Sequence, residues 1–520
     1  MQPSALQIVA LVLMLALAAP ACNPSPSTSA PDTAAAGESR GSQQQLAQRL
    51  LANATIVDGT GQPGFVGDVG IADGRIVGIG PSGSVATEPE AAVEDLQGLV
   101  LTPGFIDIHN HSDRAIVRQP QAEALLSQGL TTIAVGADGG SPWPIGAYLE
   151  EVDAARPALN VAVTVGHGTV RRRVMGDDSS REATTAEVLA MTELVRQGMA
   201  EGAFGLSSGL EYDPGRFSST EELIALARAA GESGGYYISH MRDEELYVME
   251  AIDEVIRIGR EARLPVQISH IKMGDATAWG RSAEALERIH AARDEGLDIT
   301  ADWYPYTAYA TTLALLVPSR RFDDADQVAA GLEVRGGAHR VQVTRYAADP
   351  SVEGLRLDEI AARYGKTPVE TYTQIMKNGG GRMICHSMQL EDVNAFAVDP
   401  LVMVCSDGGI GSSHPRGAGT FPRVLAHYVR EEGILDLETA VHKMTRMPAD
   451  RLGLEHRGRI EIGAIADLTA FDPQAVQDNS TFEEPELPAT GIERVWVAGE
   501  LVWNAGQPTG ARPGRALRGR

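Results

Sequence analysis

The middle of the chain alternates short apolar runs with amphipathic segments, and this alternation limits the possible fold more than any other feature. Eight runs have the length of a strand, at residues 104–109, 131–135, 161–165, 204–207, 236–240, 266–270, 298–303 and 402–406. Helical segments such as 220–230, 246–262 and 283–295 lie between them. This alternation is typical of parallel βα units, and eight such units can close into a barrel. The sequence therefore predicts an α/β fold with a TIM-like (β/α)8 barrel.

Both ends of the chain differ from this middle part. Residues 52–95 contain short apolar runs broken by Gly and Asp, which indicate short antiparallel strands joined by turns. Residues 463–503 show the same pattern. We expect both ends to build one small β-sandwich, with residues 46–102 as its N-terminal part and residues 455–510 as its C-terminal part. The barrel would occupy residues 103–454, with an insertion at about 311–400 packed over its mouth.

Length and charge narrow the range of functions. The chain has 520 residues, which is enough for a barrel with a satellite domain. Its net charge is −25 and its pI is near 4.9. Phosphate binding needs clustered Lys and Arg, and the sequence contains no long run of them. A nucleic-acid partner is therefore not expected.

The first residues are typical of an export signal. An apolar core at residues 8–19 is followed by Pro20-Ala21-Cys22, and a core this short does not span a bilayer as a mature helix. The small residue before Cys22 resembles a bacterial lipoprotein cleavage site, and plain secretion after cleavage near Ala21 is the alternative. We expect a signal peptide at 1–21 and a disordered tether at 22–45. The protein would then be exported, either periplasmic or anchored to the membrane through a lipid on Cys22.

Histidines and aspartates follow the carboxyl ends of five predicted strands, where barrel enzymes place their active sites. In chain order they are His109, His111, Asp138, His240, His270 and Asp407. One histidine after a strand is usually structural, but this many metal-binding side chains at strand ends indicate a shared site. The spacing His-x-His also suits a metal, because alternate residues of an extended segment point the same way. The sequence therefore predicts a divalent-metal centre.

Segments along most of the chain resemble one enzyme family. Residues 104–111, Gly-Phe-Ile-Asp-Ile-His-Asn-His, resemble the first-strand motif of the amidohydrolase superfamily. Further segments are similar to D-aminoacylases in particular, at 166–171, 205–210, 239–244, 269–272, 304–307, 406–408, 414–416 and 419–425. The ordered series runs from about Leu51 to Trp503 and is highly specific. The resemblance implies hydrolysis of N-acyl-D-amino acids, small-molecule substrates, to a D-amino acid and a carboxylate.

The resemblance also implies a zinc centre with two metal positions. A tighter Zn²⁺ would be held by His240, His270 and a bridging ligand from the second strand. A weaker divalent metal would lie near His109, His111 and Asp407. Zinc is expected to polarise the scissile carbonyl and to activate a water molecule.

The bridging position departs from the family pattern. D-aminoacylases carry a cysteine there, whereas the matching residue of this chain is Asp138. Aspartate is a harder ligand than a thiolate, so the identity of the metal and the number of ions stay open. Many relatives instead bridge two metals with a carboxylated lysine. No lysine occurs between His111 and His240, which excludes that arrangement.

Asp407 is the expected general base. It would take a proton from the activated water and deliver it to the departing amine. The alternative is a turn-capping aspartate, because Asp407 precedes Gly408-Gly409. The constellation of histidines and aspartates favours the catalytic interpretation.

By resemblance, the free carboxylate of the substrate would contact Lys272, Tyr304 and Arg416. Lys272 lies two residues past His270 and should point toward the metal, and the chain contains only three other lysines. A lysine combined with a bidentate guanidinium orients a carboxylate as well as neutralising it. For Arg416 a structural salt bridge is an equal alternative. Ala310 replaces a hydroxyl that family members place six residues beyond the tyrosine.

Two other functions stay open on the sequence alone. The first is a dipeptidase or a cyclic-amide hydrolase of the same superfamily, similar to dihydroorotases and hydantoinases. Simple cyclic amides lack a carboxylate, so Arg416 would then matter little. The second is a non-catalytic ligand-binding lipoprotein, which would be expected to have lost a metal or base position.

Overall fold

The computed structural model of the protein describes residues 45–519. The expected signal peptide, the lipidation site at Cys22 and nearly all of the tether lie outside the described residues. Within 45–519, no helix has the length and apolar character needed to cross a membrane.

Parallel strands form the middle of the chain, and each of the eight runs predicted from the sequence overlaps at least one of them. One sheet consists of β6 (Phe105–Asp107), β7 (Leu130–Val135) and β8 (Asn160–Val163). A second sheet contains, in order, β9 (Val165–Gly166), β10 (Gly205–Gly209), β11 (Tyr236–His240), β12 (Val266–Ile268), β13 (Ile299–Trp303) and β17 (Val402–Val404). Only Thr164 separates β8 from β9, and Asn110 forms a parallel bridge with Gly408 beyond the first and last strands.

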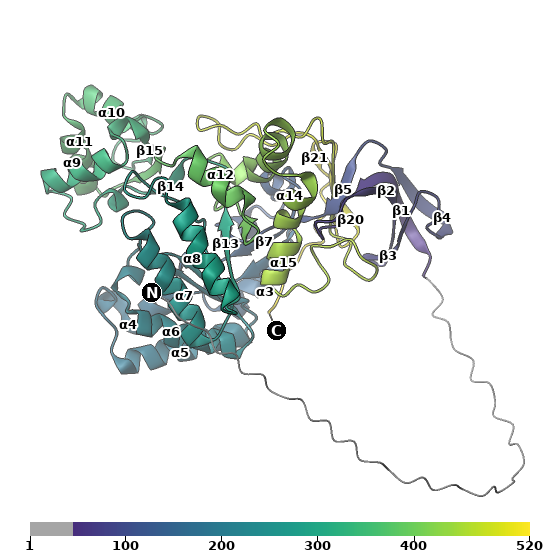
Figure 1. Cartoon of the computed structure of the whole chain (residues 1–520), viewed down its shortest axis with the longest axis horizontal. Coiled ribbons are helices and arrows are strands. Elements are labelled where there is room, and N and C mark those ends of the chain that lie inside the picture. The colour runs from purple at the N-terminus through teal and green to yellow at the C-terminus, as the bar shows by residue number, and fades with distance from the viewer. Residues whose placement is uncertain (1–44, 520) are drawn as a thin grey trace, which may run out of the picture. The chain divides into compact units, whose positions relative to one another are not determined.

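The helices between these strands pack in sequence order around the sheets. Three of them are α6 (Thr220–Glu232), α7 (Val248–Ala262) and α8 (Ser282–Asp294), each within two residues of the predicted bounds. α6 begins where the side chain of Ser219 accepts a hydrogen bond from the backbone N–H of Glu222. Their apolar faces join the strands in one hydrophobic core, and Figure 1 shows α7 and α8 side by side.

Strands from both ends of the chain form one nine-stranded sheet. Its members are β1 (Ala47–Ile56), β2 (Phe65–Ala72), β3 (Arg75–Gly80), β4 (Thr87–Asp95), β5 (Val100–Pro103), β18 (Leu468–Phe471), β19 (Ile492–Val497), β20 (Glu500–Asn504) and β21 (Gln507–Pro508). The two ends meet where β5 pairs antiparallel with β18. In Figure 1 the purple and blue strands β1, β2 and β5 accordingly lie near β20.

The prediction of antiparallel strands at 52–95 is right for β1, β2 and β3 but wrong for β4, and β5, which lies beyond that range, pairs in the same way as β4. Both of these pair parallel to β1. β4 follows β1 along Ala47–Ala52 and β5 follows it along Thr55–Ile56. One ten-residue strand can therefore hold two short partners on the same edge. A pattern of short runs and turns records where strands end but not the direction in which they pair.

Residues 309–385 build a separate small core. Its antiparallel sheet contains β14 (Tyr309–Thr312), β16 (Arg382–Cys385) and β15 (Val341–Arg345), in that order. The helices are α9 (Ala325–Val334), α10 (Leu357–Tyr364) and α11 (Pro368–Lys377), which Figure 1 shows beside β14 and β15. Side chains such as Leu316, Tyr372 and Met383 form its hydrophobic cluster. The next helix, α12 (Leu390–Val398), packs instead against α8 and β17.

Candidate metal centre

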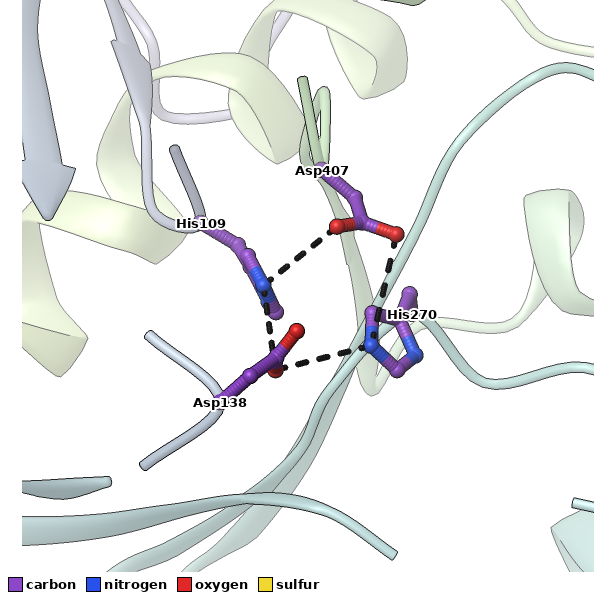
Figure 2. Close-up of side chains that lie close together, drawn as sticks. All are labelled: His109, Asp138, His270 and Asp407. Atoms are coloured by element: carbon purple, nitrogen blue, oxygen red, sulfur yellow. Dashed lines mark ion pairs between the residues drawn. The ribbon is translucent and has the colours of Figure 1, made fainter. Parts of the chain in front are cut away.

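Four side chains from four different strand ends converge on one place (Figure 2). They are His109 after β6, Asp138 after β7, His270 after β12 and Asp407 after β17, and one possible ligand atom of each lies within 4.8 Å of the others. His109 Nε2 is 3.4 Å from Asp138 Oδ1 and 3.5 Å from Asp407 Oδ1. His270 Nε2 is 3.6 Å from Asp138 Oδ1.

The other two predicted ligands adjoin this cluster. His240 Nδ1 lies 3.0 Å from His270 Nε2. His111 Nε2 lies 3.0 Å from Asp407 Oδ1 and 3.5 Å from Asp138 Oδ2. The fold therefore brings all six predicted ligands together. The two oxygens of Asp138 also face different histidines.

Several polar atoms of the cluster are buried without a hydrogen-bond partner. They include both ring nitrogens of His109 and Oδ1 of Asp138. Leaving a buried donor or acceptor unsatisfied costs about 1–3 kcal/mol, and folded proteins normally pair such groups. A divalent cation would satisfy His109 Nε2 and Asp138 Oδ1, whereas His109 Nδ1 faces Asp302. Imidazole nitrogens combined with carboxylate oxygens suit zinc and also harder divalent ions.

The backbone at three of these residues is unusual. Asp138, His270 and Asp407 have φ values of +51°, +33° and +47°, in the left-handed region that favours glycine. Such conformations cost of order 1 kcal/mol or more for other residues and concentrate at functional sites. Each residue follows a strand end directly or closely, where a turn of this kind sets the direction of the side chain.

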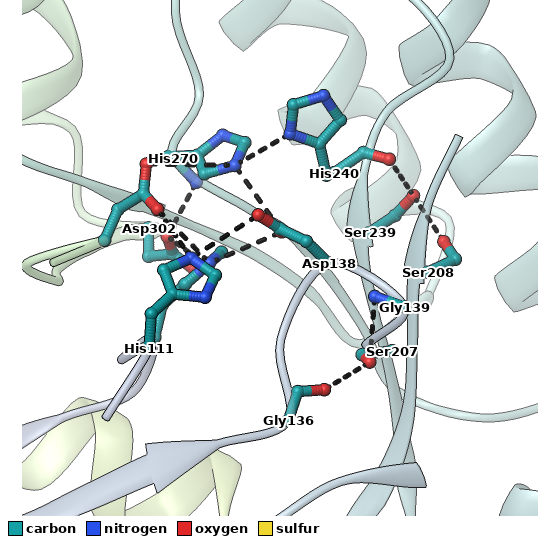
Figure 3. A network of polar contacts seen from close by, with 12 residues as sticks. His111, Gly136, Asp138, Gly139, Ser207, Ser208, Ser239, His240, His270 and Asp302 are labelled. Atoms are coloured by element: carbon teal, nitrogen blue, oxygen red, sulfur yellow. Dashed lines mark hydrogen bonds and ion pairs between the residues drawn. The ribbon is translucent and has the colours of Figure 1, made fainter. Parts of the chain in front are cut away.

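The turn that carries Asp138 is held by a serine from a neighbouring strand (Figure 3). Ser207, on β10, donates a hydrogen bond from Oγ to the carbonyl of Gly136 and accepts one from the N–H of Gly139 at 3.2 Å. The turn also packs closely on the end of β10, because a Cβ at Gly209 would lie 2.3 Å from the carbonyl oxygen of Asp138. Ser207 therefore holds the backbone on both sides of Asp138 through hydrogen bonds.

Charges within the cluster shift the pKa of its members in opposite directions. Burial lowers the pKa of His109, but Asp138, with Asp302 and Asp407, raises it more, so that the net pKa is well above the usual value. Burial and Lys272 lower the pKa of His270, while Glu244 and Asp407 raise it to about 9. Burial raises the pKa of Asp138, yet His109 and His270 bring it well below its usual range. The carboxylates of the cluster are thus stabilised in their ionised form by positive charge on the histidines. A metal ion would supply this positive charge in place of the protons on the imidazole rings.

Two acidic residues that the sequence analysis did not single out hold His270 in place. Asp302, at the end of β13, accepts a hydrogen bond from the N–H of His270 at 2.6 Å and lies 3.7 Å from His109 Nδ1. Glu244 Oε1 lies 3.0 Å from His270 Nδ1, and Glu244 Oε2 accepts a hydrogen bond from Lys272 Nζ at 2.6 Å. His270 therefore turns Nε2 toward the cluster. The strand-end position of Asp302 was a usable signal, as was the place of Glu244 in the segment 239–244.

The three residues predicted to bind a carboxylate lie beside the cluster. Arg416 Nη1 is 2.7 Å from Asp407 Oδ2, so the salt bridge considered for this arginine exists, with the predicted base as its partner. Its guanidinium lies 4.7 Å from the ring centroid of Tyr304. Within residues 45–519, Tyr304 Oη and Arg416 Nε are both buried and have no hydrogen-bond partner. Burial raises the pKa of Asp407, but Arg416 and then His270 hold it well below its usual range.

Most of the residues described above line one cavity of about 1160 Å³. Its inner wall includes Asp138, His240, His270, Lys272, Asp407 and Arg416, and its outer wall comes partly from the small core of residues 309–385. Ala310 lines this cavity as well. A cavity that combines a possible metal centre with buried, unpaired polar groups suits a small polar substrate.

Comparisons with known proteins identify the family of this chain. The chain matches the model of the Amidohydrolase family over residues 92–503. A D-aminoacylase of Alcaligenes xylosoxydans xylosoxydans is 38% identical over 501 residues, which cover 92% of this chain and 98% of that protein.

Two solved structures superpose on the chain with a TM-score of 0.82 and cover 91% of it and 100% of their own length. One is a D-aminoacylase with a binuclear metal centre, 36% identical. The other is the N-acyl-D-glutamate deacylase from Bordetella bronchiseptica, 34% identical, complexed with zinc and a phosphonate that mimics the tetrahedral intermediate of its reaction. These matches establish the TIM-barrel-like fold of the amidohydrolase superfamily. The chain therefore belongs to the amidohydrolase family, hydrolases that act on carbon–nitrogen bonds, and within it to the group of D-aminoacylases and N-acyl-D-amino-acid deacylases.

Proposed function

We propose that this protein hydrolyses the amide bond of N-acyl-D-amino acids and releases a D-amino acid and a carboxylate. One observation carries the proposal. Five of the six clustered histidines and aspartates, all except His109, line one cavity together with Arg416. Arg416 Nε and the hydroxyl of Tyr304, whose ring lies against that guanidinium, are buried donors that have no hydrogen-bond partner within residues 45–519. The first group suits a metal-assisted hydrolysis, and the second suits the free carboxylate of an acyl amino acid.

The donor set fits Zn²⁺, because it leaves buried ring nitrogens and a carboxylate oxygen without partners. His240, His270 and Asp138 would hold a tighter ion, and His109, His111 and Asp407 a second one. When bound, zinc polarises the scissile carbonyl and lowers the pKa of a water molecule at its site to about 7. Asp138 can serve both positions, since Oδ1 faces His270 and Oδ2 faces His111.

Asp407 is the residue that moves the proton. Its low pKa keeps the carboxylate ionised and ready to accept a proton from the attacking water. The same oxygen then returns that proton to the departing amine nitrogen. His111, 3.0 Å from Oδ1, and Arg416, 2.7 Å from Oδ2, hold the carboxylate in place during both steps.

The free carboxylate of the substrate would bind at Tyr304 Oη and the Arg416 guanidinium, with Lys272 behind them. Lys272 is 3% exposed and paired with Glu244, so it adds positive charge mainly through the field of that pair. A substrate carboxylate would share Arg416 with Asp407. Sharing weakens the hold of Arg416 on the base and so makes Asp407 a better proton acceptor.

The experiment that tests this function measures amine release from N-acyl D- and L-amino acids by the zinc-loaded protein. Turnover restricted to D-substrates supports the proposal. Bound zinc with no turnover would move the search to dipeptides and cyclic amides. Simple cyclic amides carry no carboxylate, so Arg416→Ala should have little effect on their binding. A protein that takes up no divalent metal would instead favour a non-catalytic ligand-binding lipoprotein.

We further propose the finer architecture and the location. The strand order, together with the bridge between Asn110 and Gly408, supports a closed (β/α)8 barrel, and the nine-stranded sheet supports a β-sandwich built from both ends. The separate core of residues 309–385 supports the insertion. The sequence of residues 1–22 supports export, with a lipid on Cys22. Mass spectrometry of the mature N-terminus and cell fractionation test the last point, since an unprocessed cytosolic chain would contradict it.

A further inference from the structure

Two arginines of the insertion line the cavity, and their side chains bind no other residue of the described part of the chain. The Lys and Arg side chains lining it, among the described residues, are Lys272, Arg345, Arg382 and Arg416. The inner two are paired, Lys272 with Glu244 and Arg416 with Asp407. Arg345 and Arg382 are exposed, and neither forms an ion pair or hydrogen bond through its side chain within residues 45–519.

These two arginines also lie directly opposite each other. Arg345 ends β15 and Arg382 begins β16, and they are cross-strand partners in the antiparallel sheet. Like charges at such positions repel each other and destabilise a sheet. The register of β15 shifts between Val343 and Arg345, and bulges of this kind re-aim side chains next to active sites. The sheet thus tolerates an unfavourable pair of charges on the wall of the cavity.

The surroundings of the pair do not neutralise it. The chain has 69 acidic residues against 44 basic ones, and some exposed arginines elsewhere pair with carboxylates, as Arg257 does with Glu221 and Glu261. Glu353, the acidic residue of the insertion on this cavity, accepts a hydrogen bond from the N–H of Tyr346 at 2.7 Å. The hydroxyl of Thr344, beside Arg345, faces the same cavity and is buried without a hydrogen-bond partner. An anion from solution would accept hydrogen bonds from the side chains of Arg345, Arg382 and Thr344.

We infer that Arg345 and Arg382 form a second anion subsite, which binds a carboxylate carried by the substrate in addition to its α-carboxylate. The inference rests on the proposed function and names the substrate class within it, N-acyl-D-amino acids with two carboxylates. The second carboxylate can come from the amino-acid side chain or from a dicarboxylic acyl group. Both present the same planar anion to a pair of guanidinium groups.

The test uses two matched substrate pairs with the zinc-loaded enzyme. N-acetyl-D-glutamate against N-acetyl-D-glutamine examines a side-chain carboxylate, and N-succinyl-D-leucine against N-butyryl-D-leucine examines an acyl carboxylate. Each pair keeps size and shape nearly constant and changes one charge. In one of the pairs we expect kcat/KM to favour the charged member by about 3- to 30-fold, the range for two solvent-exposed charge contacts, and the preference to fall as salt is added.

The variants are Arg345→Gln, Arg382→Gln and the double variant, with Lys377→Gln as control. Lys377 belongs to the same insertion but does not line the cavity, so its loss changes the net charge alone. The double variant should lose the preference and keep kcat/KM for the neutral substrates within about twofold. Lys377→Gln should keep the preference.

The pair that shows the preference identifies the source of the carboxylate. Equal kcat/KM for charged and neutral members in both pairs would overturn the inference while leaving the proposed function intact. So would a preference that survives in the double variant. No turnover of any of the four substrates, with zinc bound, would overturn the proposed function and the inference together.

Discussion

Replacing Asp407 with asparagine removes one negative charge and keeps the shape of the side chain. Two losses follow from the contacts of this residue. Without a proton acceptor, kcat should fall by about 10²- to 10⁴-fold, the usual contribution of a general base. Arg416, which is 5% exposed and 2.7 Å from Asp407 Oδ2, would also keep its charge without its partner. Breaking a buried pair in this way costs about 3–5 kcal/mol.

These two losses can be measured separately. For a chain of this length the entropy of unfolding is about 1 kcal/mol per degree, so the loss of stability corresponds to a fall in Tm of about 3–5 °C, which leaves the protein folded at 25 °C. Activity is measured as single-turnover amine release, with zinc content determined on the same samples. Asp253→Asn is the matched control, because Asp253 pairs with Arg288 at the surface and its side chain is 54% exposed. A kcat within threefold of the parent enzyme, at equal zinc content, would refute Asp407 as the base.

Three further predictions follow from the same site. Ser207→Ala frees the backbone on both sides of Asp138, so zinc affinity should fall by about 10- to 100-fold while saturating zinc restores kcat; unchanged affinity in a metal titration would contradict this positioning role. The pKa of His270 is raised to about 9, so at neutral pH zinc must displace a proton from its ring, and apparent affinity should rise with pH up to about 9. Calorimetry in two buffers with different ionisation enthalpies detects the released protons, and equal heats in both buffers would show that none is released. Tyr304→Phe removes a buried hydroxyl that would donate to the substrate carboxylate, which should raise KM about 5- to 10-fold with little change in kcat. A fall in kcat with unchanged KM would contradict the assignment of Tyr304 to substrate binding.

The location of the site could be predicted because it depends on a few local rules. Apolar runs mark parallel strands, and parallel strands present their carboxyl ends at one edge, so His109 and Asp407 meet although they are far apart in the chain. Asp302 follows the same rule and could have been named. Glu244 lies in the segment 239–244, which was singled out, but its contact with His270 could not be predicted because that contact depends on how the loop after β11 folds back. No local pattern encodes that path.

Pairing between distant segments is the other feature that the sequence did not reveal. Alternating polar and apolar residues tell which face of a strand is buried, but not which strand lies beside it or in which direction. The parallel arrangement of β4 and β5 on β1 is one such case. The opposition of Arg345 and Arg382 is another, since it requires the register between β15 and β16. Both emerge only from tertiary contacts.

The pairing of β5 with β18 also determines when the nine-stranded sheet can be completed during synthesis of the chain on the ribosome. Thr102 and Thr469, which are partners in that pairing, are 367 residues apart. At about 5–20 residues per second, a ribosome needs roughly 20–70 s to deliver the second strand after the first. During that interval the edge of β5 is an open template for wrong partners, which is the usual start of aggregation. In a protein truncated after the last βα unit, the edge of β5 would stay unpaired permanently. The C-terminal strands are therefore needed for a soluble product, even though no residue after Arg416 belongs to the proposed catalytic machinery.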